Sequence, residues 1–136
     1  IEWVAFASNA FNVLVPFYAD VNEIPEYLGN TTGEVSTDNF YWSSRLIAAM
    51  ADASYRKSIF HIERYQEHVM SRAHELIGLC DASLAKESDA DKRLELKQKA
   101  NQALADMLKA ETASTLDKVL YELSNLMKNA YSRSDA

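Results

Sequence analysis

The sequence has 136 residues, which suits one folded domain and is too short for two independent hydrophobic cores. Hydrophobic residues make up 48% and charged residues 25%, so the chain is expected to be globular, and its net charge of −6 argues against general nucleic-acid binding. The single cysteine excludes an intrachain disulfide, and no run of 18 apolar residues occurs, so no membrane partner is expected.

Residues 1–21 hold two short apolar runs that predict a pair of β-strands. The runs, residues 3–6 and 11–18, are rich in β-branched and aromatic residues, and a Ser-Asn-Ala stretch between them has turn chemistry. The runs barely alternate, so both faces are expected to be buried, whereas Pro16, which has no N–H, indicates an edge or a bulge. A two-stranded hairpin is marginal alone, and we interpret these strands as part of a larger sheet. Because the sequence starts in such a run without a methionine, Ile1 is interpreted as a cut or processing point.

Residues 22–37 are predicted to form a loop, because proline and glycine interrupt any regular pattern there. A first helix is expected over about residues 38–54, where apolar residues recur at near-helical spacing. Three candidate N-caps precede it: Ser36, Thr37 and Asp38.

Two long helices are predicted over about residues 55–86 and 89–129. The first carries apolar residues in a 3–4 alternation interrupted by Gln66. The second carries a similar stripe: Leu104, Leu108, Thr112, Leu116, Val119, Leu123, Leu126 and Ala130. Ser88 and Asp91 resemble a capping box in the short connection, which folds the helices into an antiparallel hairpin at least about 45 Å long at 1.5 Å per residue. The predicted fold class is therefore mainly α, with this hairpin, one shorter helix and the N-terminal strand pair.

Several histidines and glutamates on the second helix were the first candidates for a metal site: His61, Glu63, Glu67, His68 and His74. A di-metal bundle requires a Glu-x-x-His spacing, and neither this pattern nor His-Glu-x-x-His is present. We therefore expect a solvated helix face, with His68 contacting Arg64 and Arg72. No metal or other cofactor is predicted.

Other candidate residues also favour structural roles. Cys80 occupies an apolar helix position beside Asp81, without the cationic neighbour or helix N-terminus that activates a thiol, and is expected to be a small core residue. Five aromatic residues are expected in the core: Tyr41, Trp42, Tyr55, Phe60 and Tyr65. Asn30-Thr31-Thr32 is interpreted as a chance match to the N-glycosylation pattern. The mixed charges over residues 92–99 predict a solvated face. The residues themselves thus indicate no catalytic, cofactor-binding or metal-ligating group.

The first 56 residues nevertheless resemble a segment late in the dipeptidase A family of lactic-acid and related bacteria. The resemblance is carried by Glu2-Trp3-Val4-Ala5-Phe6, Asn9, Phe11-Asn12, Val15-Pro16-Phe17-Tyr18, Ser36-Thr37-Asp38-Asn39-Phe40-Tyr41-Trp42, Arg45-Leu46, Asp52 and Tyr55. From residue 56 onward the chain agrees in helical character more than in identity.

The resemblance implies the C-terminal part of a cytoplasmic cysteine dipeptidase, an N-terminal-nucleophile hydrolase with a four-layer αββα sandwich. The nucleophile would be a cysteine near the start of the full-length protein, with its own α-amino group as base. It would lie outside this chain, and Cys80 matches no catalytic position. Asn9 and Asn12 lie near the strand turn, where a structural role is favoured over an approach to the active site.

This resemblance divides the chain into a strand pair of the parent sheet over 1–21, a loop over 22–37 and a helical region over 38–136. The expected partners are the remainder of the parent and, for the parent, a dipeptide. The isolated chain is expected to self-associate through residues 1–21. Two alternatives remain open: a stand-alone helical protein-interaction module without enzymatic activity, and a metal-binding bundle, which the missing ligand spacing disfavours.

Overall fold

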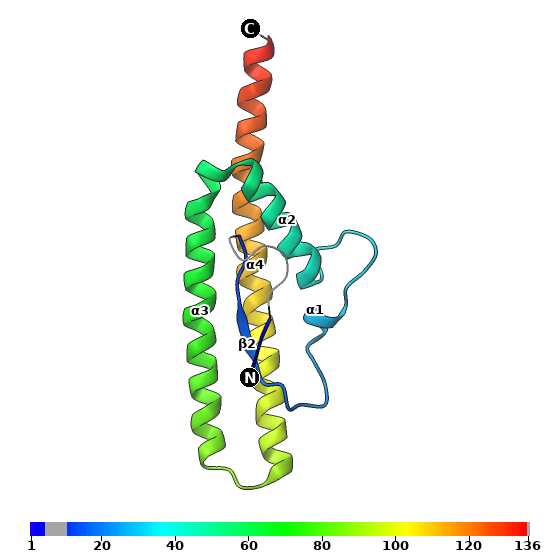
Figure 1. Ribbon diagram of the computed structural model, residues 1–136, viewed down its shortest axis with the longest axis vertical. Helices are drawn as coiled ribbons and strands as arrows, with labels where there is room; N and C mark the ends of the chain where they lie inside the picture. Colours follow the sequence, from blue (N-terminus) through cyan, green and yellow to red (C-terminus); the bar gives the residue numbers. More distant parts are fainter. Residues whose placement is uncertain (5–10, 136) are drawn as a thin grey trace.

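The computed structural model describes residues 1–4 and 11–135, with side chains described as far as residue 128. These residues form two strands and four helices (Figure 1). In chain order the elements are β1 (Glu2–Val4), β2 (Val15–Phe17), α1 (Glu26–Gly29), α2 (Phe40–Ala53), α3 (Tyr55–Ala85) and α4 (Ala90–Asp135). The mainly α fold class with an N-terminal strand pair is confirmed.

Helices α3 and α4 form the predicted antiparallel hairpin (Figure 1). Their apolar stripes face each other, and Ile62 and Val69 of α3 are fully buried, as are Leu108 and Val119 of α4. At 1.5 Å per residue, α3 with its 31 residues is about 46 Å long and α4 with its 46 residues is about 69 Å long. Because α4 ends at Asp135 rather than near residue 129, it extends well past the start of α3.

The connection between α3 and α4 is capped differently from the prediction. The side chain of Asp89, not Ser88, accepts hydrogen bonds from the backbone N–H groups of Asp91 and Lys92, at 2.9 and 3.2 Å. Arg93 donates to the carbonyl oxygens of Leu84 and Glu87, which satisfies acceptors at the end of α3. The predicted Ser88–Asp91 capping box is therefore wrong, although the turn is in the predicted place.

Helix α2 also begins with a cap that was not predicted. The side chain of Asn39 accepts a 2.9 Å hydrogen bond from the Trp42 N–H, and Asn39 has the extended backbone typical of an N-cap. Ser36, Thr37 and Asp38 lie one to three residues too early. The predicted loop over 22–37 contains the four-residue helix α1, which is too short to leave a periodic signal.

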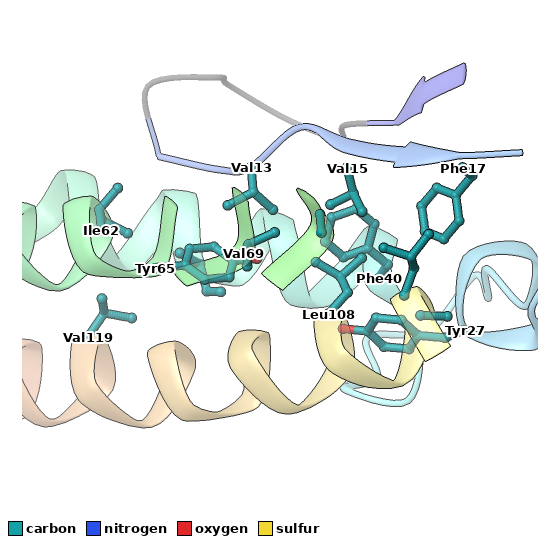
Figure 2. Packing of buried hydrophobic residues seen from close by; sticks show 14 of the residues in the cluster. Val13, Val15, Phe17, Tyr27, Phe40, Ile62, Tyr65, Val69, Leu108 and Val119 are labelled. Atoms are coloured by element: carbon teal, nitrogen blue, oxygen red, sulfur yellow. The ribbon is translucent and has the colours of Figure 1, made fainter. Parts of the chain in front are cut away.

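The sheet consists of β1 and β2 in antiparallel pairing, with Glu2 opposite Phe17, Trp3 opposite Pro16 and Val4 opposite Val15. The connection at residues 5–10, including the expected turn, lies outside the described residues. Figure 2 shows Val13, just before β2, and Val15 and Phe17 of β2 pointing toward the helices. The expectation that both faces are buried is wrong for part of the sheet, since Trp3 is 52% exposed.

One hydrophobic core joins β2 to all four helices (Figure 2). It includes Val15 of β2, Tyr27 of α1, Phe40 of α2, Tyr65 of α3 and Leu108 of α4. The strand pair and the short helices thus share one core with the α3–α4 hairpin.

Candidate functional site

The most connected polar cluster lies where the chain leaves β2 and meets α3 and α4. The side-chain amide of Asn101 on α4 accepts a 2.8 Å hydrogen bond from the Tyr18 N–H and donates a 2.9 Å hydrogen bond to the Tyr18 carbonyl. The Tyr18 hydroxyl donates to Asp81 on α3 over 2.6 Å. Tyr18 therefore connects the end of β2 to both long helices.

This cluster is built for structure rather than for proton transfer. Burial, followed by the hydrogen bond to Asp81, raises the pKa of Tyr18, so the phenol stays neutral and serves as a donor. Neighbouring Cys80 is 8% exposed, and its thiol contacts the carbonyl oxygen of Leu96 at 3.6 Å. A carbonyl cannot accept a proton as a general base does. The prediction that Cys80 is a buried core residue is confirmed.

A second polar cluster holds the segment that precedes β2. Asn12 is 3% exposed, and its side-chain nitrogen donates to the carbonyl oxygen of Ser44 on α2 over 3.2 Å. The backbone carbonyl of Asn12 accepts a 3.0 Å hydrogen bond from the side chain of Gln66 on α3. Asn12 therefore ties this segment to two helices. Asn9, the other candidate near the turn, lies outside the described residues.

A third polar pair lies inside the helical hairpin. The hydroxyl groups of Tyr65 on α3 and Thr112 on α4 are 2.8 Å apart, and both residues are buried. Burial raises the pKa of Tyr65, and it also raises the pKa of Tyr27, which lies nearby on α1. These neutral phenols help to hold α1, α3 and α4 together.

The histidines and glutamates of α3 are spread over its surface rather than gathered. His61 lies 3.2 Å from Glu122, and His68 lies 3.6 Å from Glu111, so both contact α4. Glu63, Glu67 and His74 are exposed. Among the side chains described, those of residues 1–4 and 11–128, no three of His, Cys, Asp or Glu are grouped so as to hold a metal ion.

Two of the α3 side chains that were expected to contact each other, His68 and Arg72, both lie against a carboxylate of α4. Arg72 forms an ion pair with Glu111 of α4 at 3.2 Å, and His68 contacts the same carboxylate. Arg64 lies over the Phe60 ring, 4.2 Å from its centroid. Side chains at the edge of a hairpin can reach the opposite helix as well as the next turn of their own helix.

The five aromatic residues predicted for the core divide into three groups. Tyr65 is buried, Tyr41 and Trp42 are half-buried, and Tyr55 and Phe60 are 53% and 51% exposed. The core prediction is therefore wrong for Tyr55 and Phe60, which lie on the outer side of the first turns of α3.

Two remaining candidates have local partners. Trp42 donates through its indole N–H to the Thr32 carbonyl over 2.7 Å, and Arg45 lies 5.2 Å above the same ring system. The Asn30 amide donates to the Asp38 carbonyl over 3.1 Å within the loop. Of the predicted solvated charges over 92–99, Lys97 pairs with Asp20, and the hydrogen bond from Lys97 lowers the pKa of that exposed carboxyl.

Asn101 and Asp81 were missed by the sequence analysis. A signal for Asn101 was present, because this residue lies three positions before Leu104 and so continues the apolar stripe of α4. A polar residue within such a stripe is buried and requires a partner. No comparable signal marks Asp81, which is exposed on α3. Across the described residues, no helix is both long and apolar enough to cross a membrane.

Comparison with known proteins gives the missing context for these clusters. Residues 1–68, half of the chain, match the family profile of peptidase family C69. The chain belongs to peptidase family C69. The matched part of this C69 chain includes β1, β2, α1, α2 and the first half of α3.

Curated relatives of this C69 chain carry dipeptidase names. It is 41% identical over 135 residues to a probable dipeptidase A of Streptococcus pyogenes, and 35% identical over 172 residues to a dipeptidase of Bifidobacterium longum. It is 26% identical over 135 residues to the dipeptidase A of Lactobacillus helveticus. Each comparison covers 99% of this chain but 28%, 32% and 28% of the respective relative. The C69 chain thus spans about a third or less of the length of these relatives.

Proposed function

We propose that this chain is the C-terminal structural region of a dipeptidase whose catalytic nucleophile lies elsewhere in the full-length protein. The observation that carries the proposal is the C69 match over residues 1–68, together with relatives that are named dipeptidases. The polar clusters agree with it, because Tyr18, Asn12 and Tyr65 are engaged in packing and Cys80 contacts a backbone carbonyl.

In this proposal the full-length protein hydrolyses dipeptides to amino acids. A cysteine at its mature N-terminus attacks the peptide carbonyl, and its own α-amino group takes the thiol proton, so nucleophile and base belong to one residue. The chain described above contributes no group to that step. The free, buried state of Cys80 is compatible with a reducing compartment, and we place the protein in the cytoplasm.

The role proposed for the chain is to complete and cover the hydrolase sheet. Residues 1–21 would contribute strands to an αββα sandwich, residues 22–37 would connect them, and residues 38–136 would form a helical layer. The packing of Val13, Val15 and Phe17 against α3 and α4 supports this role (Figure 2). Layered α/β folds are built from sheets that bury one face against helices in this way. The partner is then the remainder of the same protein.

The test compares three proteins against a panel of dipeptides. The full-length protein is expected to release amino acids, its Cys80→Ser variant is expected to retain that activity, and the isolated chain is expected to release none. Substitution of the cysteine at the mature N-terminus should abolish hydrolysis. Dipeptide hydrolysis by the isolated chain that disappears in Cys80→Ser would contradict the proposal.

A further inference from the structure

The two strands of the sheet have different outer edges, and Pro16 reveals how their backbone groups are directed. Because proline has no N–H, the Trp3–Pro16 pair cannot exchange backbone hydrogen bonds. In the flanking pairs, Glu2–Phe17 and Val4–Val15, the backbone N–H and C=O groups therefore point toward the partner strand. Backbone direction alternates along a strand. The backbone groups of Pro16 therefore point away from β1, and those of Trp3 point away from β2.

The outer edge of β2 is closed by its own chain. The alternation turns the N–H and C=O of Tyr18 away from β1, and the Asn101 amide binds both, at 2.8 and 2.9 Å. Pro16 presents no donor on this edge. Before the strand, the Asn12 carbonyl accepts from Gln66. A further strand could pair with β2 only by displacing side chains of α3 and α4.

The outer edge of β1 has no such closure among the described residues. Of the helices and strands described, β1 contacts β2 alone. Trp3 directs one N–H and one C=O away from the sheet, and its side chain is 52% exposed. An unpaired edge with a large exposed aromatic residue is unusual for a finished sheet, because free edges invite pairing with another strand.

A cavity of about 250 Å³ borders Glu2 and Val4 of β1, on the side of the sheet that faces the helices. Its other walls are formed by Phe17, Tyr18 and Asn101, and by residues that follow β2, among them Val21, Ile24 and Leu28. Ile24 is 68% exposed. A strand added next to β1 would direct alternate side chains to this same face, where the cavity offers an apolar position for one of them.

We propose that the sheet continues across β1, through Trp3, into a strand from the part of the full-length protein that lies outside this chain. The inference rests on the proposed function, in which this chain is one part of a larger hydrolase, and on the 28% share of the relatives' length that it spans. The sheet cannot grow in the other direction, because Asn101 and Pro16 close β2. The chain thus presents one directional attachment edge.

Hydrogen exchange of the full-length protein at single-residue resolution tests this proposal without any substitution. The amides of Glu2 and Val4 face β2 and should be protected in either case, so they are internal controls. If β1 is an inner strand, the Trp3 amide is protected as well, with exchange slowed at least about 100-fold relative to an unprotected amide. Exchange of Trp3 at the unprotected rate, beside slow Glu2 and Val4, would overturn the proposal.

Two further outcomes would show that a second copy of the chain occupies the edge of β1, or that the full-length protein is not a dipeptidase. Protection of Trp3 that is lost on dilution, together with dissociation of a dimer, would assign the edge to a second copy and refute the strand proposed above. Dipeptidase activity is measured on the same sample. Activity with an unprotected Trp3 refutes the attachment edge alone, whereas a protected Trp3 without activity refutes the proposed function alone.

A pair of variants in the full-length protein supplies a second measurement. Trp3→Ala removes the side chain, and Trp3→Pro also removes the outward N–H. Proline is tolerated where that N–H faces solvent, so equal melting temperatures for the two variants would contradict an inner strand. The proposal requires Trp3→Pro to melt at least about 2 °C below Trp3→Ala.

Discussion

Two segments of α4 carry the same apolar periodicity, but one is buried and the other is largely exposed. Between Leu104 and Val119 the stripe is buried against α3, with Leu104, Leu108 and Val119 fully covered. Beyond Glu122 the helix continues as an overhang, defined here as residues 123–135, which extends past the other elements (Figure 1). In this overhang Leu126 is 37% exposed and Met127 is 65% exposed.

The difference arises from where α3 begins. The chain turns at Ser54 from α2 into α3, and His61 contacts Glu122, so the antiparallel partner for α4 ends less than two turns beyond this contact. Leu123 and Leu126 continue the stripe, but Leu123 is only half-buried and Leu126 is exposed. Periodicity thus predicts which face of a helix is apolar, whereas burial depends on how far the partner reaches.

The largest difference in the free energy of unfolding is expected when one leucine in each segment is replaced by alanine. Leu108→Ala should lower the free energy of unfolding by about 2–5 kcal/mol, because Leu108 is fully buried and the change leaves a cavity. Leu126→Ala, its matched control in the overhang, should cost less than about 0.5 kcal/mol. Urea melts of the 136-residue chain measure both. Equal losses in the two variants would mean that the overhang is also packed.

A smaller effect is expected from the hydroxyl pair inside the packed segment. Tyr65→Phe removes the hydroxyl that lies 2.8 Å from the buried Thr112 hydroxyl, and should cost about 1–3 kcal/mol. The same change at Tyr121, which is 64% exposed, should be close to neutral in the same melts. A Tyr65→Phe variant as stable as the wild type would show that the pair contributes nothing net.

The burial of Tyr65 also predicts that the stability of the fold falls at alkaline pH. Burial raises the pKa of Tyr65 above its ordinary value of 10.0, so the folded state favours the neutral phenol. This contribution to stability is fully present below about pH 10 and is lost as the pH rises above it. Tyr65→Phe should therefore lose less stability than the wild type between pH 9 and 11, while the buried Tyr18 and Tyr27 keep part of the effect.

The smallest effect is expected at the boundary between the two segments. Glu122→Gln removes the carboxylate that contacts His61 at 3.2 Å, and both side chains are about one-fifth exposed. Such a partly exposed pair contributes less than about 1 kcal/mol. Glu63→Gln, on the exposed face of α3, is the control. A cost above about 2 kcal/mol for Glu122→Gln would make this contact a main support of the hairpin rather than its margin.

The features that could be predicted from the sequence are those that depend on local periodicity. The starts of α2, α3 and α4 were placed within two residues, because their apolar residues recur over several turns. The end of α4 was predicted six residues early, since the stripe ends at Ala130 while the helix does not. Helix α1 was missed because four residues cannot show a period.

What could not be predicted depends on contacts between distant segments. Tyr55 and Phe60 have helical spacing like core residues, but the turn at Ser54 places them outside. Arg72 and His68 share Glu111 of α4, a contact that the pattern of α3 alone does not reveal. Family membership was reached through a resemblance in residues 2–56 rather than through a predicted catalytic site. Self-association of the isolated chain stays a prediction.

The hydrogen bonds between Tyr18 and Asn101 join residues that are 83 positions apart. On a ribosome that adds about 5–20 residues per second, Asn101 is therefore synthesised roughly 4–17 s after Tyr18. During that interval Val15 and Phe17 have no α4 to pack against, and β2 has an open outer edge. The newly made strand pair must stay out of aggregates until α4 has been synthesised, so the speed of translation sets how long this part of the nascent chain needs protection.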